Sequence, residues 1–432
     1  MCRLRIYAYQ DYVRQYQQLV HFHTTDPRGW FNHSCLFEDE PSQCQYPDFG
    51  SKNSRVWTAE VPIYRRLLAT CVITEDPKTA DAFLVPMLFG TITTLKWGRF
   101  NGGGFTTRSF IGEMQQNATL FLPDVKKGKP SVLPYLNRTT EPRHIVLFTV
   151  DCQYAWPQAQ NMLVVHLGDD ASWLPCEEKH LKGCKRPRHS PKQSTYFENG
   201  LTVPYRISHW LPLGLLGRRT SADRVEGLSR QRRWLLFGNL ALQRHAARSR
   251  LASSLNDSAF RLGVYNRVYI HAGHDGAAMK TVREAAEATA QSVFCLCPTG
   301  DSKGFTGRFW FALAHGCIPV RYDGWARNLT FEEIAWPFRD RIDWHRAVVN
   351  VNIGEESQLL ERLLAMPERE LDDRLRYVRK VAPWLSYRGD AAGQPPKSHR
   401  GIDAAQLLIE QLEARLLADA RSAPTQSQTH TK

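Results

Sequence analysis

One stretch of this 432-residue chain, 292 to 323, constrains the fold more than any other. It begins as an apolar strand, continues as a loop that contains Gly300, and then becomes helical over 308 to 315. A tight turn at Gly316 leads into a second apolar strand. Because a strand, a crossover helix and a strand form the repeating unit of parallel sheets, this stretch predicts an α/β fold.

The same alternation of strands and helices occurs on both sides of a polar segment at 214 to 231. The continuous apolar run 144 to 150 is typical of a strand buried on both faces of a parallel sheet. Shorter strands are predicted at 4 to 9, 82 to 85 and 232 to 238. Helices are predicted at 57 to 70, 244 to 255, 277 to 291, 355 to 381 with a break at Pro367, and 402 to 419.

These patterns divide the chain into an N-terminal half, a linker and a C-terminal half. We expect an N-terminal Rossmann-like domain at 1 to 213, a linker at 214 to 231 and a second Rossmann-like domain at 232 to 385. A helical extension at 386 to 419 and a disordered tail at 420 to 432 complete the predicted organisation.

Composition excludes several classes of protein. The 12 Trp, 15 Tyr and 20 Phe exclude a disordered chain, and no apolar run reaches the roughly 18 residues of a membrane-spanning helix. The net charge of +13 favours anionic partners, which include nucleic acid, acidic glycans and nucleotide-sugars. No recognised nucleic-acid-binding motif is present, so we predict no nucleic-acid partner.

Cysteines and sequons bear on the cellular compartment. Cys35 with Cys44, and Cys176 with Cys184, flank polar segments that short disulfides could close. Cys295 and Cys297 form a CxC pair without a matching pair nearby, and we interpret them as strand residues rather than a zinc site. Five N-x-[S/T] sequons favour a secretory-pathway lumen; they begin at Asn32, Asn117, Asn137, Asn256 and Asn328. The first residues have no apolar signal region.

The loop between the strand and the helix of 292 to 323 carries the clearest chemistry. A loop that enters a helix N-terminus offers free backbone N–H groups and the positive end of a dipole. Thr299, Gly300, Asp301 and Ser302 could surround a pyrophosphate or a ribose. Arg308 could bind a phosphate through two parallel hydrogen bonds. The alternative is an ordinary strand–helix turn with a surface arginine.

The same stretch resembles the C-terminal signature of the exostosin family, glycosyltransferase family 47. The matching residues are Ser292, Phe294, Cys295, Leu296, Pro298, Gly300, Arg308 and Gly316 to Val320, followed by Pro337-Phe338 and Ile342-Asp343-Trp344. Phe237, Gly238 and Asn239, with Arg244 and Arg248, resemble the strand and arginines that open the donor domain.

The N-terminal half resembles the same family in the same order. The matching residues are Ile6 to Tyr9, Trp57 to Leu68, Thr74, Asp76-Pro77, Ala80-Asp81, Phe83 and Val85-Pro86. Together the motifs extend over about 4 to 385.

The resemblance implies a GT-B type fold, in which two Rossmann-like domains face each other across a cleft, here with added C-terminal helices. It implies that the domain at 1 to 213 lies on the acceptor side and that the domain at 232 to 385 binds the nucleotide-sugar. It implies an inverting glycosyltransferase that moves a hexosyl, pentosyl or glucuronosyl group from a UDP-sugar to a glycan or glycoprotein acceptor. It also implies no cofactor and no essential metal, a partnership with itself or a related transferase, and a Golgi or ER lumen location. The type II membrane anchor expected from the family is absent from this chain.

Under this resemblance, the donor-binding candidates are Gly238, Asn239, Arg244, Arg248, Thr299, Gly300, Asp301, Ser302, Arg308 and Asp323. A general base must take a proton from the acceptor hydroxyl. Asp151, which follows the strand 144 to 150, is the first candidate and Glu60 is the second. The alternative roles are a turn aspartate for Asp151 and a helix-surface ion pair for Glu60.

Two departures from the family pattern keep a second function open. Phe311 occupies the place before Ala312 where the family commonly has an acidic residue. A motif upstream of Asp151 remains only as Asn137-Arg138 and Arg143-His144. These departures favour the alternative of a non-catalytic glycan-binding or partner subunit on the same fold.

Overall fold

A computed structural model of the chain describes about half of its residues. The described ranges are 3–9, 59–68, 70, 72–85, 133, 135–136, 140–148, 162–167, 200–205, 227–242, 246–273, 282–298, 305–322, 331–387 and 402–422.

The N-terminal half contains a sheet of six strands in the order β2-β1-β3-β4-β5-β6. Its strands are all parallel: β1 (Ile6–Ala8), β2 (Ile73–Thr74), β3 (Ala82–Val85), β4 (His144–Phe148), β5 (Leu163–His166) and β6 (Gly200–Thr202). All four residues of β3 are buried, as expected for a strand that is covered on both faces.

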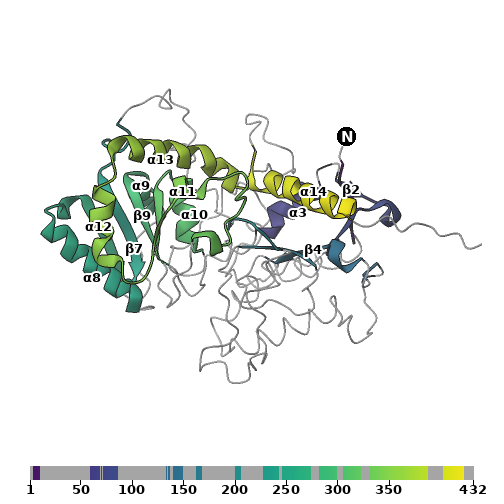
Figure 1. Ribbon diagram of the computed structural model, residues 1–432, viewed down its shortest axis with the longest axis horizontal. Coiled ribbons are helices and arrows are strands. Elements are labelled where there is room, and N and C mark those ends of the chain that lie inside the picture. The colour runs from purple at the N-terminus through teal and green to yellow at the C-terminus, as the bar shows by residue number, and fades with distance from the viewer. Residues whose placement is uncertain are drawn as a thin grey trace, which may run out of the picture.

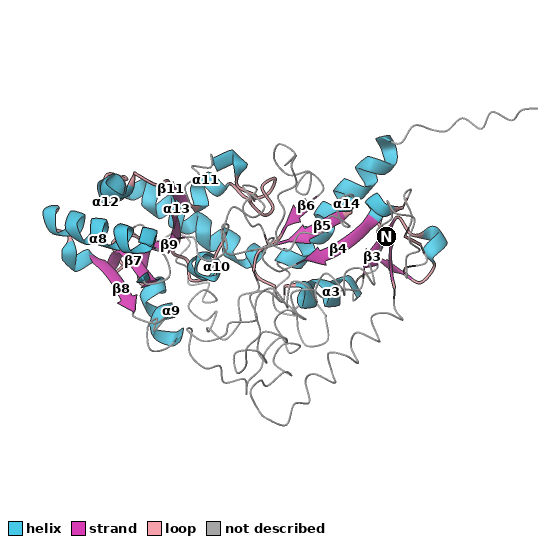
Figure 2. Cartoon of the chain, turned by 90° about the horizontal axis from the view of Figure 1, so that it is seen from below, coloured by secondary structure: helices cyan, strands magenta, loops and turns pink. Residues whose placement is uncertain are grey.

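The C-terminal half contains a second parallel sheet, of five strands in the order β11-β10-β9-β7-β8. Its strands are β7 (Trp234–Ala241), β8 (Val268–Gly273), β9 (Ser292–Pro298), β10 (Ile318–Tyr322) and β11 (Val349–Val351). Figures 1 and 2 show the two sheets in separate parts of the molecule, each with its own helices.

The two sheets have the same strand order around their first strands. The first strand of each half pairs with the second strand on one side and with the third strand on the other. The chain therefore reverses its direction across the sheet between β1 and β3, and again between β7 and β9. In open parallel sheets, ligands bind outside the carboxyl ends of the strands at such a reversal point.

The helices cover these sheets. They are α3 (Glu60–Leu68), α8 (Ala246–Arg261), α9 (Val282–Ala290), α10 (Gly307–Ala314), α11 (Trp344–Ala347), α12 (Glu356–Leu364), α13 (Glu368–Val381) and α14 (Ala404–Ser422). Helix α8 lies beside α12, and α10 contacts β9, β10 and α13 (Figure 1). Helix α10 is buried over 309–313, and its apolar sequence explains why it occupies the interior.

The C-terminal helix α14 packs on the N-terminal half rather than on the sheet that precedes it in sequence. It contacts α3 (Figure 1), and Arg66 of α3 forms a 2.7 Å salt bridge with Asp403. Asp403 also caps α14, because its Oδ1 accepts a hydrogen bond of 2.8 Å from the backbone N–H of Gln406. Both ends of the chain therefore contribute to the first half.

The predicted fold class is confirmed: the chain is α/β, with two parallel sheets of Rossmann type in a GT-B arrangement and additional C-terminal helices. The predicted break at Pro367 separates α12 from α13. Helix α14 continues to Ser422, past the predicted start of the tail at 420. The sequon at Asn256 lies inside α8, where Ser258 is buried.

Part of the predicted linker is anchored to the second half. Asp372 of α13 accepts hydrogen bonds from the backbone N–H groups of Gly227 (2.7 Å) and Ser229 (2.8 Å). Burial of Asp372 acts to raise its pKa, but these bonds outweigh burial and the pKa lies below its ordinary value. The described end of the linker is therefore a fixed turn.

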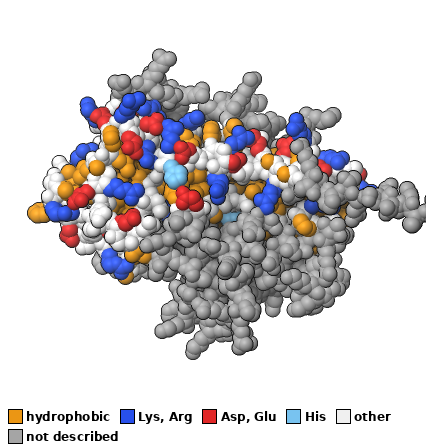
Figure 3. All heavy atoms as spheres, viewed as in Figure 1, with side chains coloured by type: hydrophobic (Ala, Val, Ile, Leu, Met, Phe, Trp, Pro, Cys, Tyr) orange, Lys and Arg blue, Asp and Glu red, His pale blue; other side chains and the backbone are white. Residues whose placement is uncertain are grey.

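The surface in Figure 3 carries charges of both signs. Lys and Arg are interspersed with Asp and Glu over the described elements, so the excess positive charge is not gathered into one patch on this face. Among the described residues, no helix combines the length and the apolar character needed to cross a membrane.

Candidate functional site

The reversal point of the second sheet lies between the carboxyl ends of β7 and β9. The register pairs Phe237 with Cys295 and Gly238 with Leu296. The chain beyond β9 returns to the described residues at Phe305, shortly before α10 begins at Gly307. This edge therefore combines two strand ends with a helix N-terminus.

The first turn of α10 has the features of an anion site. Its N-cap, Thr306, has an extended backbone and makes no capping bond with its side chain. The Thr306 Oγ1 atom is buried and has no hydrogen-bond partner. The first backbone N–H groups of a helix have no partner within the helix and attract negative charge. An anionic group is the kind of ligand that such N–H groups favour.

Arg308 adds a cation to this turn. It is the second residue of α10 and is partly exposed. Its charge is close enough to act on the buried Cys297 thiol at the end of β9. Burial dominates and raises the pKa of Cys297 to about 12, while Arg308 acts to lower it. The guanidinium therefore lies near the carboxyl end of β9.

Gly238 and Asn239 lie side by side in β7 but differ in role. A Cβ on Gly238 would come within 3.3 Å of Leu296 and 3.7 Å of Ile270, so this glycine allows close packing of three strands. Asn239 is buried, and its Oδ1 has no hydrogen-bond partner. An unsatisfied amide at the reversal point is a polar group that a ligand could satisfy.

Arg248 lies in the first turn of α8, which follows β7, and it is buried. The structure thus places Asn239, Arg248 and Arg308 on elements that begin or end at one edge of the second sheet. The other donor candidates, Arg244, Thr299, Gly300, Asp301, Ser302 and Asp323, lie outside the described residues, and so does Asp151.

Glu60 is the first residue of α3, and its side chain has no exposed surface. A carboxylate in this place must exchange its hydration for protein partners.

The first half also contains a buried polar pair, Tyr9 and His144, which the sequence analysis did not identify. The Tyr9 hydroxyl lies 2.9 Å from His144 Nε2, and His144 Nδ1 lies 2.8 Å from the carbonyl oxygen of Thr140.

These two bonds define the proton positions on His144. Since Nδ1 faces a carbonyl oxygen it carries the proton, and Nε2 accepts from the Tyr9 hydroxyl. Burial lowers the pKa of His144 to about 4; the bond to Thr140 opposes this effect and the charge of Arg143 adds to it. The imidazole is therefore neutral at physiological pH and packs against Phe83, with 4.9 Å between ring centroids.

A further polar pair lies at the end of β10. The Tyr322 hydroxyl donates a 2.5 Å hydrogen bond to Oε1 of Glu356 in the first turn of α12. Burial acts to raise the pKa of Glu356. The bond from Tyr322, the backbone N–H groups of Gly354 and Glu356, and the charge of Arg250 lower it to a net value below normal. Glu356 is therefore an ionised carboxylate at the same edge of the second sheet.

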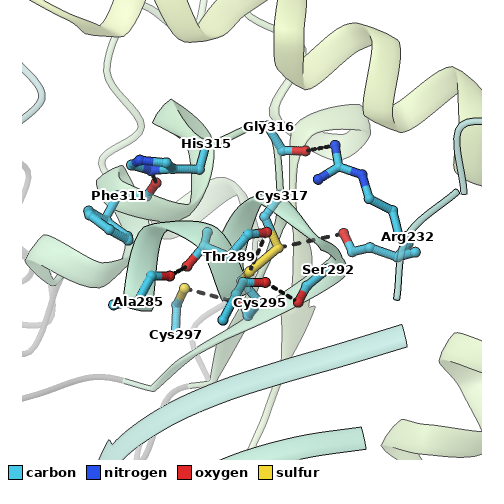
Figure 4. Close-up of a disulfide and its surroundings, with 12 residues drawn as sticks. Arg232, Ala285, Thr289, Ser292, Cys295, Cys297, Phe311, His315, Gly316 and Cys317 are labelled. Atoms are coloured by element: carbon cyan, nitrogen blue, oxygen red, sulfur yellow. Dashed lines mark hydrogen bonds between the residues drawn. A yellow bond between two sulfur atoms is a disulfide. The ribbon is translucent and has the colours of Figure 1, made fainter. Parts of the chain in front are cut away.

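A disulfide joins β9 to the residue that precedes β10. Cys295 of β9 is bonded to Cys317, which precedes β10 (Figure 4). Cys297 is a buried free thiol. The interpretation of Cys295 and Cys297 as strand residues is confirmed, because both lie in β9 and one is already bonded to another cysteine. No group of three or more His, Cys, Asp or Glu side chains in the described ranges is arranged to hold a metal ion.

Phe311, at the place of the family's acidic residue, is buried in α10. Its ring lies 4.2 Å from that of His315, measured between centroids. The carbonyl oxygen of Phe311 lies 2.7 Å from His315 Nδ1. This position therefore contributes packing, with no acidic group.

The chain is similar to a known family and to a curated protein. The family model for the exostosin GT47 domain matches residues 1–366. A probable glycosyltransferase of Arabidopsis thaliana is 28% identical over 131 residues, which cover 30% of this chain and 24% of the relative. The match thus spans about a quarter of the relative's length.

Proposed function

The chain belongs to the exostosin GT47 family, and from this premise we propose that it is an inverting glycosyltransferase. The proposed reaction moves a sugar from a UDP-sugar to a hydroxyl of a glycan or glycoprotein acceptor. The observation that carries the proposal is the edge of the second sheet, where the N-terminus of α10 and Arg308 adjoin the reversal point between β7 and β9.

The donor diphosphate is proposed to bind at this edge. The N–H groups at the start of α10 would contact phosphate oxygens, and Arg308 would pair with one phosphate. Arg248, and Arg244 four residues before it in sequence, would add positive charge from the β7 side. As the glycosidic bond to UDP breaks, negative charge grows on the departing phosphate, and these groups stabilise it. The proposed chemistry therefore needs no essential metal.

The acceptor side is proposed to supply the base. Sugar transfer passes through an oxocarbenium-like centre, and an inverting reaction brings the acceptor hydroxyl to the face opposite UDP. A base removes the hydroxyl proton as the new bond forms. Asp151 remains the first candidate and Glu60 the second. The complete enclosure of Glu60 favours Asp151, because a base must reach the acceptor.

The disulfide supports a proposed location in the Golgi or ER lumen. Stable disulfides form in oxidising compartments and are rare in the cytosol, and Cys295 and Cys317 form one within the second sheet. An assembly with itself or with a related transferase is part of the same proposal.

A second candidate function has one specific observation in its favour. Phe311 packs against His315 where the family commonly has an acid. If that acid is needed for turnover, the chain would bind UDP and glycan without transfer and would act as a partner subunit.

A turnover assay separates the two functions. The purified chain is incubated with a panel of UDP-sugars and glycan acceptors, with and without EDTA. UDP release is measured, and NMR gives the anomeric configuration of any product. Transfer with inversion in EDTA supports the enzyme. UDP binding without release from any donor supports the partner subunit, and product with retained configuration contradicts the proposed mechanism.

A further inference from the structure

A buried hydrogen bond joins the first sheet to the segment that leads into α10. Tyr205 lies just beyond β6, and its hydroxyl donates to the carbonyl oxygen of Phe305 over 2.9 Å. Both side chains are buried. The bond connects residues 100 positions apart in the sequence. It therefore links the carboxyl edge of one sheet to the carboxyl edge of the other.

The acceptor of this bond is held in a rigid environment. Phe305 immediately precedes the N-cap of α10 and packs in an aromatic cluster. Its ring centroid lies 4.8 Å from Phe309, 5.0 Å from Trp310 and 5.1 Å from Trp336. The Tyr205 ring also lies beside Trp310, at 6.3 Å between centroids. Tyr205 thus touches the start of α10 through both its ring and its hydroxyl.

This position matters because the direction of the first N–H groups of α10 depends on the backbone just before them. The Phe305 carbonyl belongs to the peptide bond that joins Phe305 to Thr306, and the first turn begins at Gly307. A helix N-terminus binds an anion best when its N–H groups already point at the site, because no ordering is then needed upon binding. A hydrogen bond that anchors residue 305 supplies such order.

We propose that Tyr205 is a positioning residue that holds the start of α10 in its anion-binding conformation from the side of the first sheet. The inference rests on the proposed function, because it assumes that the α10 N-terminus receives the donor diphosphate. Tyr205 acts through Phe305 and makes no proposed contact with the donor. Its hydroxyl raises donor affinity by ordering the site in advance.

The chain supplies a matched control. The hydroxyl of Tyr387 donates to the carbonyl oxygen of Pro204 over 2.8 Å, and Tyr387 is buried as well. This bond reaches the residue next to Tyr205, but its donor comes from the segment after α13 and its acceptor is Pro204 rather than Phe305. The Tyr387→Phe variant removes an equivalent bond from the same region without freeing Phe305.

The test compares Tyr205→Phe with Tyr387→Phe and the unmodified full chain. UDP affinity is measured by calorimetry, and stability by thermal unfolding. One buried neutral hydrogen bond corresponds to about a three- to tenfold change in an equilibrium constant. We expect both variants to lose a similar few degrees in Tm. Only Tyr205→Phe is expected to bind UDP about three- to tenfold more weakly.

Each outcome has a defined meaning. Equal UDP affinity in both variants and the unmodified chain would overturn the role of Tyr205 while leaving the donor site intact. Absence of UDP binding by the folded, unmodified chain would overturn the proposed function itself, and this inference with it.

A second measurement applies if Tyr205→Phe fails to fold. Amide hydrogen exchange of the unmodified chain is then followed with and without UDP. Slower exchange at Val203 and Tyr205 in the presence of UDP would support the coupling, since these residues directly follow β6 of the first sheet. Unchanged exchange there, with slower exchange in the first turn of α10, would contradict it.

Discussion

The two halves have the same strand order at their reversal points but are stabilised differently. In the second sheet, β7 alone spans eight residues, the register with β8 is continuous, and a disulfide ties β9 to the start of β10. In the described part of the first sheet, no strand exceeds five residues. The first sheet instead depends on buried polar groups and on α14, which returns from the end of the chain.

The two halves differ in whether their contacts are local or distant in the sequence. The half proposed to hold the donor is built from local sequence, because its strands and helices follow one another within 232 to 385. The half proposed to hold the acceptor needs distant segments, including Asp403 against Arg66. Substitutions should therefore act locally in the second half and over long sequence distances in the first.

We expect the largest loss of stability from a substitution at the contact between α14 and the first half. In Asp403→Ala, Arg66 loses the Asp403 carboxylate while its own side chain is only 11% exposed, and α14 loses its cap. Breaking a buried ion pair destabilises a protein by about 3 to 5 kcal/mol. Urea unfolding measures the loss, and hydrogen exchange should show α3 and α14 opening first.

The control for this prediction is Glu410→Ala, which removes the exposed partner of Arg341 from the same helix. Exposed pairs contribute less than about 1 kcal/mol. Equal destabilisation by the two variants would contradict a special role for Asp403.

The disulfide gives the next largest effect. It closes a loop with a sequence separation of 22 residues, for which chain entropy predicts about 3 kcal/mol of stabilisation. The double variant Cys295→Ala/Cys317→Ala should lose this amount in chemical unfolding, with the loss confined to the second half. Cys297→Ala, a neighbouring buried cysteine without a disulfide, should lose only about 1 kcal/mol.

A reducing agent provides the complementary check. It should lower the unfolding midpoint of the unmodified chain more than that of the double variant. An equal response of both proteins to the reductant would contradict the assignment of stability to this bond.

Acid should affect the first sheet more than the second. Burial is the main cause that lowers the pKa of His144 and of His166 to about 4, from an ordinary 6.5. The unfolded chain then binds more protons than the folded one between these values, so stability falls as pH falls through this window. At a pH one unit below the ordinary histidine pKa, each of these histidines lowers the free energy of unfolding by about 1 kcal/mol.

In the second half, burial also lowers the pKa of His315, so some acid sensitivity is expected there too. Hydrogen exchange at pH 7.5 and 5.5, corrected for intrinsic rates, should show the greater loss of protection in β4 and β5. His144→Gln should reduce this loss, and His345→Asn, an exposed control, should not. Equal losses of protection in the two sheets would contradict a greater acid sensitivity of the first sheet.

Much of the second half could be predicted from sequence, because its buried strands are apolar runs with clear breaks. The helix predicted at 308 to 315 is α10, and the run that begins at Ser292 is β9. The strand β8 was not predicted, because its sequence VYIHAG has neither a continuous apolar run nor regular alternation. The short strand β11 likewise depends on pairing with β10 rather than on local preference.

The tertiary links of the site had no local signal. The disulfide requires the register that pairs Cys295 with Pro319, which brings Cys317 alongside β9. The bond from Tyr205 to Phe305 joins two segments whose sequences show no complementarity. The resemblance to the family identified Arg308 and the strand ends, while the groups that position them became visible only in the folded chain.

The central claim is that the second sheet holds a nucleotide-sugar at the N-terminus of α10. Calorimetry of UDP with the purified chain tests it directly, with and without EDTA. Arg308→Ala is the test variant. Arg261→Ala is the control, because Arg261 is an exposed arginine at the C-terminal end of α8. We expect micromolar binding that persists in EDTA, weakens about tenfold or more in Arg308→Ala, and is unchanged in Arg261→Ala. A folded chain that does not bind UDP, or that binds it equally well without Arg308, would contradict the account.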